Sequence, residues 1–319
     1  MLTRRSLLAF ATLGLAPRAA AQDRVRLVFA TAGEGSAFLA FGKAAASVAE
    51  RHAPIAIEIR ETRGSNENAE LVSAGEVQIA TLNMGPAYDA WNGQGPFAGR
   101  PLRGFRAVAP MYETPFHTIA LKGSGIGSFR ELSGRRVGVG PVGGPPEVFF
   151  RGLAEMLSVK ATLVAGTPAE LARKVLARDI DAFWYGSGIP SPPFVEIADK
   201  AEAVVFGLKP DEAQALRRRF PYFAPYEIPA GTYRGQAEGL SSLAVWNFVV
   251  AHEGVPADVI YALAKVLLDH ADEVRAAYPT AAAMTRANAV ANTVLPFHRG
   301  AARYYREKAV PVRPALLDG

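Results

Sequence analysis

Apolar runs short enough for strands alternate with stretches of helical periodicity from residue 24 onward. The pattern predicts strands over residues 24–30, 55–60 and 77–82, and helices over residues 37–52 and 64–74. Ser36 precedes the first of these helices, where its hydroxyl can cap free N–H groups. Alternating strands and helices are typical of α/β proteins with a parallel sheet, so this fold class is expected.

A second set of elements repeats this order later in the chain. Strands are predicted over residues 136–140, 161–164 and 180–185, and helices over residues 147–157 and 168–178. Thr167 and Glu170 have the spacing of a capping box at the start of the second helix. The repetition predicts two lobes, each built from βαβ units.

The chain is expected to pass from one lobe to the other at two crossovers, near residues 116–119 and 240–247. A discontinuous first lobe would let the C-terminal helices return to it, and one such helix is predicted over residues 256–278. We therefore expect a first lobe of residues 22–116 and 245–319 and a second lobe of residues 117–244, with a cleft between them.

The first 21 residues are typical of an export signal. Arg4 and Arg5 precede an apolar run over residues 7–16, and three alanines at 19–21 supply a cleavage site before Gln22. The run is too short to span a bilayer, and no later stretch reaches about 18 uncharged apolar residues, so no membrane insertion is expected. Two arginines suit both the Sec and the twin-arginine routes, which stay open.

Composition removes several function classes. The chain has 319 residues with 35 Lys and Arg against 30 Asp and Glu, and loss of the signal would remove three arginines and no acid. The remaining chain is nearly neutral, so no nucleic-acid partner is expected. The lack of cysteine excludes disulfides, thiolate zinc sites and a cysteine nucleophile.

Catalytic and cofactor motifs are weak. Residues 138–143 match G-x-G-x-x-G, but Pro141, Pro145 and Pro146 remove backbone donors where a pyrophosphate would bind. The five histidines lack the paired spacing of a metal site, and no serine stands in G-x-S-x-G. We expect no cofactor, no metal and no catalysis, although an exported hydrolase or transferase that uses the same cleft remains an alternative.

Polar, glycine and aromatic residues gather at the carboxyl ends of the predicted strands. Ligands of open α/β sheets bind there, where helix N-termini present free N–H groups to an anion. Two lobes that present such ends to each other would enclose a small molecule. The candidate ligand-binding residues are Thr31, Gly33, Glu34, Gly35, Ser36, Gly64, Ser65, Asn66, Asn83, Met84, Tyr88, Gly143, Gly144, Tyr185 and Ser187.

Several motifs occur in the order found in a known family. They lie at residues 64–68, 87–93, 132–141, 228–233 and 296–305, and read GSNEN, AYDAWNG, LSGRRVGVGP, IPAGTY and PFHRGAARYY. With them the chain resembles the TAXI class of extracytoplasmic solute receptors. The resemblance implies the type II bilobal periplasmic binding protein fold, a periplasmic location, and a solute that is delivered to TRAP membrane permease subunits. We also expect a monomer, and an ABC-importer receptor of similar fold stays open.

Three departures from this family concern the ligand, which in the family is usually a dicarboxylate or an acidic amino acid. Glu34 lies in the first loop, Asn83 and Met84 stand where relatives often have Gln, and Pro145 and Pro146 replace hydroxyl-bearing residues. Each lost donor to a charged group removes about 1.5–3 kcal/mol. These departures weaken the expectation of a dicarboxylate and favour a monoanion, a zwitterion or a neutral polar solute, unless Glu34 points to solvent at the rim of the cleft.

Overall fold

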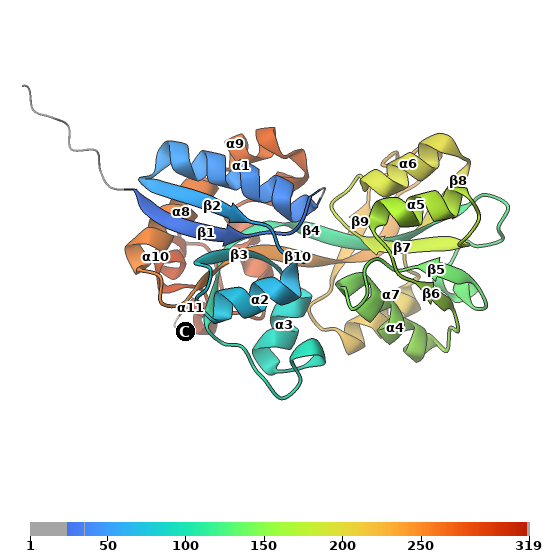
Figure 1. Cartoon of the computed structure of the whole chain (residues 1–319), viewed down its shortest axis with the longest axis horizontal. Coiled ribbons are helices and arrows are strands. Elements are labelled where there is room, and N and C mark those ends of the chain that lie inside the picture. Colours follow the sequence, from blue (N-terminus) through green and yellow to red (C-terminus); the bar gives the residue numbers. More distant parts are fainter. Residues whose placement is uncertain (1–23, 35, 318–319) are drawn as a thin grey trace, which may run out of the picture.

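Two lobes lie side by side and share two long strands (Figure 1). The structure, a computed structural model, describes residues 24–34 and 36–317; the predicted export signal and Gly35 lie outside the described residues. The long strands are β4 (Phe105–Leu121) and β10 (Leu240–His252), which pair antiparallel with each other. Helices cover the sheet in both lobes, so the α/β class expected from the sequence is confirmed.

The first lobe begins with three parallel strands. β1 (Val25–Ala30) lies between β2 (Ile55–Arg60) and β3 (Ile79–Asn83), and β3 pairs antiparallel with β10. Ser36 caps the first helix as predicted, because its hydroxyl oxygen accepts a hydrogen bond from the Leu39 N–H over 3.1 Å. The helices are α1 (Ala37–His52), α2 (Ser65–Ser73), α3 (Met84–Asn92) and η1 (Gly95–Phe97).

The second lobe repeats the parallel plan. Successive residues of β7 face opposite ways, Phe183 against Phe194 of α6 and Trp184 against Phe150 of α4, so helices cover both faces of this sheet. The strands are β5 (Arg136–Gly138), β6 (Thr162–Val164), β7 (Ala182–Gly186), β8 (Ala203–Phe206) and β9 (Ala224–Ile228). The helices are η2 (Phe129–Leu132), α4 (Pro145–Leu157), α5 (Pro168–Leu176), α6 (Pro192–Lys200) and α7 (Pro210–Arg219).

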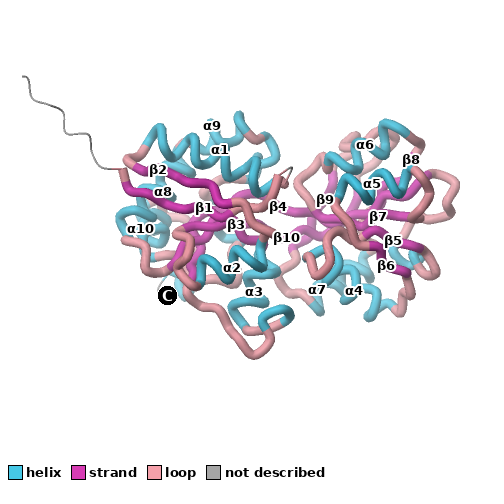
Figure 2. The backbone as a smooth tube through the Cα atoms, in the orientation of Figure 1, coloured by secondary structure: helices cyan, strands magenta, loops and turns pink. Residues whose placement is uncertain are grey.

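The long strands β4 and β10 carry hydrogen-bonded neighbours from both lobes. β3 pairs with residues 247–251 of β10, whereas β7 pairs with residues 116–120 of β4 at the other end. The strand order β2-β1-β3-β10-β4-β7-β5-β6 is therefore continuous, and Figure 2 shows the strands running from one lobe into the other. Residues 242–251 of β10 are all buried, because helices and loops pack on both faces.

The C-terminal helices return to the first lobe (Figure 1). The single helix predicted over residues 256–278 is wrong, because the backbone leaves the helical region at His270, where φ is −110° and ψ is 28°. Apolar positions such as Val266 and Val274 continue across the break and hide it from a periodicity argument. The elements are α8 (Ala257–Asp269), α9 (Ala271–Ala277), η3 (Pro279–Ala283), η4 (Ala287–Ala291), α10 (Arg299–Glu307) and α11 (Pro314–Leu317).

None of the helices in the described ranges combines the length and the apolar character that a bilayer span requires.

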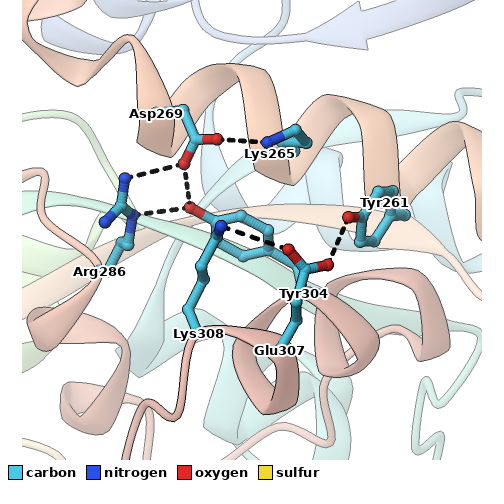
Figure 3. Close-up of polar contacts among 7 residues, drawn as sticks. All are labelled: Tyr261, Lys265, Asp269, Arg286, Tyr304, Glu307 and Lys308. Carbon is cyan, nitrogen blue, oxygen red and sulfur yellow. Dashed lines mark hydrogen bonds and ion pairs between the residues drawn. The ribbon is translucent and has the colours of Figure 1, made fainter.

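A polar network fastens α8 to its neighbours (Figure 3). Asp269, the last residue of α8, accepts hydrogen bonds from Lys265 Nζ over 2.6 Å, Arg286 Nη2 over 2.9 Å and the Tyr304 hydroxyl over 2.6 Å. Partial burial raises the pKa of Asp269, but the bonds from Lys265 and Tyr304 outweigh it and bring the pKa down to about 2. The ionised carboxylate therefore joins α8, α10 and the segment before η4.

Candidate functional site

The carboxyl ends of four strands face each other across the two lobes. β1 and β3 run in the direction of β4, whereas β5 and β7 run in the opposite direction. Because β3 pairs at one end of the long strands and β7 at the other, these carboxyl ends point toward each other. We call the region between them the interlobe site; it comprises residues 31–34, 36, 64–66, 83–88, 139–144 and 185–188, with the aromatic residues that contact these segments.

In the loop after β1, Thr31 and Ser36 form hydrogen bonds within the first lobe. Thr31 is buried, and its carbonyl oxygen accepts hydrogen bonds from Asn68 Nδ2 over 2.6 Å and from Thr62 Oγ1 over 3.0 Å. Ser36 caps α1, Gly33 is half-buried, and the Glu34 side chain is exposed. Gly35, also a predicted site residue, lies outside the described residues.

A chain of amide and hydroxyl groups runs from α2 to the long strands. Ser65 Oγ accepts a hydrogen bond from the Asn83 N–H over 3.1 Å, and Asn83 Nδ2 donates to Asn247 Oδ1 over 3.1 Å. Asn247 Nδ2 in turn donates to the carbonyl oxygen of Tyr112 over 2.9 Å and to Thr114 Oγ1 over 2.7 Å. The predicted residues Ser65 and Asn83 thus lie together and use these polar atoms within the first lobe.

Three other predicted residues at the starts of α2 and α3 are not part of this chain of hydrogen bonds. Gly64 and Asn66 flank Ser65 and are half-buried, and the Asn66 side-chain amide has no hydrogen-bond partner among the described residues. Met84 opens α3 and is buried in the core of the first lobe. Asn66 therefore has a free amide at the first turn of a helix, where backbone N–H groups are also free.

The predicted residues of the second lobe follow β5 and β7. Gly143 is exposed and its N–H donates to Glu147 Oε2 over 2.7 Å, while Gly144 is the N-cap of α4. Ser187 Oγ donates to the Gly188 carbonyl oxygen over 3.1 Å. Tyr185, the last of these residues, is half-buried, and burial of its phenol raises its pKa to about 12.

Sequence reasoning missed Tyr112, a tyrosine of β4 at the centre of the interlobe site. Its ring lies 6.0 Å from that of Phe41 and 5.8 Å from that of Tyr278, between ring centroids. Burial raises its pKa well above the usual value, and the nearby phenols of Tyr278 and Tyr185 add to this effect. Among the described residues no group forms a well-aligned hydrogen bond with the buried Tyr112 hydroxyl, although the Tyr278 hydroxyl is close enough to interact with it. Its place in an apolar strand gave no signal in the sequence.

The lobes touch on both flanks of this site. On one flank, Tyr88 of α3 lies 5.5 Å from Tyr222 between ring centroids, and a methyl group at Gly85 would lie 2.8 Å from Cζ of Phe149. The Tyr222 hydroxyl is also buried without a partner among the described residues. On the other flank, Gly188 packs directly against Thr280. Aromatic rings from both lobes therefore wall the site, and two buried hydroxyls without a well-aligned partner among the described residues lie in these walls.

Charged groups near the first-lobe loops are mostly paired. Arg63 Nε lies 2.9 Å from Glu67 Oε2, and Arg60 Nη1 lies 4.0 Å from a carboxylate oxygen of Glu76. Burial raises the pKa of Glu113 on β4, which favours the neutral form of this carboxyl group over the negative carboxylate. Neither arginine is an unpaired cation that would attract a second carboxylate of a ligand.

Two histidine environments bear on catalysis and metal binding. His117 is buried in β4, with Nε2 2.7 Å from the Tyr233 hydroxyl, and burial lowers its pKa to about 3. Such an enclosed imidazole cannot reach a solute. Within the described ranges the group of histidine and carboxylate side chains that could hold a metal ion is His52, His270 and Glu273, at the far end of α1 from the interlobe site.

Solved structures of similar shape are periplasmic binding proteins. MatC from Rhodopseudomonas palustris with bound malate has a TM-score of 0.52 and 15% identity, covering 80% of this chain and 88% of that chain. A TctC solute binding protein from Polaromonas has a TM-score of 0.51 and 14% identity, over 82% and 88% of the two chains. A second R. palustris protein, solved with adipate, has a TM-score of 0.52 and 17% identity, over 76% and 82%. The fold is therefore the bilobal periplasmic binding protein fold expected from the sequence.

A family model described as NMT1-like family matches residues 29–309. The match starts within β1 and ends just after α10, so it includes both lobes and both long strands. With most of its length inside that match, the chain belongs to the NMT1-like family.

Proposed function

We propose that the protein is an extracytoplasmic solute receptor that binds a small organic solute between its lobes and passes it to TRAP-type permease subunits. The observation that supports this most is a pair of buried hydroxyls in walls built by both lobes: among the described residues Tyr222 has no hydrogen-bond partner, and Tyr112 has none with good geometry. A buried hydroxyl without a partner costs about 1–3 kcal/mol, which a solute that bonds to it would offset. The motifs shared with the TAXI class support the TRAP partner and a periplasmic location.

Closure of the two lobes on the solute is part of this proposal. The first lobe would comprise residues 22–116 and 245–319, and the second residues 117–244, with the hinge in β4 and β10. The pairing of these strands shifts register between Trp246 and Phe248, and such irregularities let strands bend. A solute that contacts both lobes favours the closed arrangement, and no catalytic step is needed.

The proposed solute is an organic acid or amino-acid-like molecule with at most one net negative charge. Glu34 is exposed in the first loop, and the two nearby arginines already have carboxylate partners. A second carboxylate on the ligand would meet no free cation at these positions, and like charges disfavour each other in a partly buried site. The polar groups that we assign to the solute are Tyr112, Tyr222 and Asn66.

Calorimetry with the folded protein tests the proposal, with succinate, 2-oxoglutarate, glutamate, glutamine and neutral amides as probes. We expect a monoanionic, zwitterionic or neutral compound to bind and to raise the melting temperature by mass action. Tyr112→Phe should lower the affinity for that compound by about two- to tenfold, the equivalent of one neutral hydrogen bond. Submicromolar binding of succinate that Tyr112→Phe leaves unchanged would contradict both the solute class and the site.

The TRAP partner needs a separate test, because solute binding alone does not identify the permease. Membrane vesicles that contain a TRAP permease should accumulate the solute only when the receptor is added outside. Uptake that requires ATP instead would point to an ABC importer.

A further inference from the structure

Two histidines and a glutamate gather on the surface of the first lobe, away from the interlobe site. His52 ends α1, His270 lies between α8 and α9, and Glu273 belongs to the first turn of α9. α1 has 16 residues and is therefore about 24 Å long, and its other end is the Ser36 cap at the interlobe site. The cluster thus lies a helix length from the Ser36 end of the interlobe site.

The donor atoms of these side chains converge on one point. His52 Nε2 lies 2.8 Å and His270 Nδ1 lies 3.2 Å from the same carboxylate oxygen, Oε1 of Glu273. All three atoms lie within 4.8 Å of one another, and each side chain is 30–38% exposed. A cation about 2.0–2.2 Å from each atom fits this spacing with small side-chain movements.

One such movement follows from the stacking of the imidazoles. The rings of His52 and His270 are 3.7 Å apart between centroids and only 14° from parallel. A ring nitrogen binds a metal with a lone pair in the plane of its own ring, so two stacked rings cannot both point at one ion. One ring must therefore turn about its Cβ–Cγ bond, and His52, at the exposed end of α1, has room to do so.

The surroundings act on a cation in two ways: Arg51 is itself positively charged and repels it, whereas the C-terminus of α1 attracts it. Glu273 Oε2 accepts a hydrogen bond from Arg51 Nη2 over 2.6 Å, and Arg51 Nη1 donates to Ser47 Oγ over 2.7 Å. These bonds orient the carboxylate in the way that outer partners orient metal ligands. His52 also stands at the C-terminus of α1, where the helix dipole is negative and attracts positive charge.

We propose that His52 Nε2, His270 Nδ1 and Glu273 Oε1 form a Zn²⁺ site, with water in the remaining position. Two imidazoles and one carboxylate suit Zn²⁺, whereas Mg²⁺ and Ca²⁺ prefer oxygen ligands alone. The histidines are far apart in sequence and neither belongs to a motif, which is why spacing did not reveal the site.

Such an ion would join α1 to the break between α8 and α9. Phe41 of α1 and Tyr278, which follows α9, both pack against Tyr112. The two elements that the ion joins therefore carry the aromatic neighbours of the central tyrosine. The Zn²⁺ site does not depend on the proposed function, since none of its ligands belongs to the interlobe site.

Competition for Zn²⁺ against a chromophoric chelator, with the whole folded chain and no solute, tests the proposal. The wild type should bind one Zn²⁺ per chain and melt at a higher temperature when Zn²⁺ is present. His52→Ala, His270→Ala and Glu273→Gln should each lower the affinity for Zn²⁺ by at least about tenfold, since loss of even an outer partner of a metal ligand lowers affinity that much. Excess Mg²⁺ should leave Zn²⁺ bound.

His252→Ala is the matched control, because His252 is a partly exposed histidine of the same lobe whose Nδ1 accepts a hydrogen bond from the Gly254 N–H. It should leave Zn²⁺ affinity unchanged. Glu273→Gln keeps the shape of the side chain and serves if an alanine variant fails to fold. Equal Zn²⁺ affinity in the wild type and in Glu273→Gln, or an equal loss in His252→Ala, would overturn the site.

Discussion

At the scale of single residues, the interlobe site contains two kinds of polar group. Asn68 is fully buried, and its amide reaches the carbonyl oxygens of Thr31 and Thr81 over 2.6 and 2.8 Å. Asn66, two positions earlier on α2, has an amide without a partner among the described residues. The first amide therefore contributes to the stability of the lobe, and the second is free to bind a solute.

Replacing each of these two residues by leucine should separate the two roles. Asn66→Leu should weaken solute binding by at least about tenfold and leave the melting temperature nearly unchanged, because only a ligand contact is lost. Asn68→Leu should lower the free energy of unfolding by about 1–3 kcal/mol or more, because buried carbonyl oxygens lose their donor. Calorimetry and thermal unfolding of both variants measure the two effects. An Asn66→Leu variant that binds as tightly as the wild type would assign Asn66 to structure alone.

The residue types in a sequence can indicate which loops form a site. They do not indicate which polar atoms in those loops lack a hydrogen-bond partner. Ser36 and Ser65 have suitable side chains in the expected loops, yet both hydroxyl oxygens accept hydrogen bonds from backbone N–H groups of their own lobe. Tyr112 stands in an apolar strand, and only the folded chain brings it beside Tyr185 and Tyr278. Which polar atoms stay unpaired depends on contacts between distant segments, and periodicity carries no information about those contacts.

At the scale of elements, the start of α3 in the first lobe packs directly against α4. Gly85 has no side chain, and this lets the helix start lie against Phe149 and Tyr222. The sequence predicted the strand before α3, although two residues early at its start, but not this contact between lobes. Element types follow from local patterns, whereas the packing of one helix start on another helix does not.

Gly85→Ala should hold the lobes apart. The added methyl group would lie 2.8 Å from Phe149 Cζ and 3.0 Å from Tyr222 Cε2, closer than carbon atoms pack without a shift. Solution scattering should give a larger radius of gyration than the wild type, and solute affinity should fall. Gly127→Ala is the control, since its methyl group would meet only a Glu131 oxygen at 3.8 Å. Equal scattering curves for the two variants would mean that this contact does not limit closure.

The polar network at the end of α8 should make stability depend on pH. The pKa of Asp269 is lowered from 3.8 to about 2 in the folded chain, so its contribution is fully present above the unfolded value and is lost as the pH falls toward 2. Asp269→Asn should therefore melt below the wild type at neutral pH, and the difference should shrink between about pH 4 and pH 2. Thermal unfolding across this range measures it. A difference that stays constant down to pH 2 would show that the charge of Asp269 is not what stabilises α8 and α10.

At the scale of the whole molecule, the two lobes share one continuous sheet and are not separate domains joined by a flexible linker. The strand order passes through β10 and β4 without a gap, and each of these strands pairs in both lobes. Relative motion of the lobes must therefore come from bending or twisting of these two strands. The proposed closure would then be a rotation about the middle of β4 and β10.

A saturating solute should accordingly reduce the radius of gyration and slow hydrogen exchange near residues 116 and 243, where the two strands pair between the lobes. The physical reason is that a closed state, held by contacts to both lobes, opens less often. Solution scattering and hydrogen exchange measured by mass spectrometry check the two parts. If a tightly bound solute leaves the scattering curve unchanged, the receptor binds without closing.

The pairing of β3 with β10 also constrains the order in which the chain can fold. Asn83 and Asn247 are 164 residues apart, yet their side chains bond to each other and their strands are neighbours. During synthesis β3 therefore exists with one edge unpaired until nearly the whole second lobe has been made. An unpaired edge of this kind can add a strand from another chain. Completion of the first lobe thus waits for a late segment, and the interval before it arrives is when misassembly between nascent chains competes with folding.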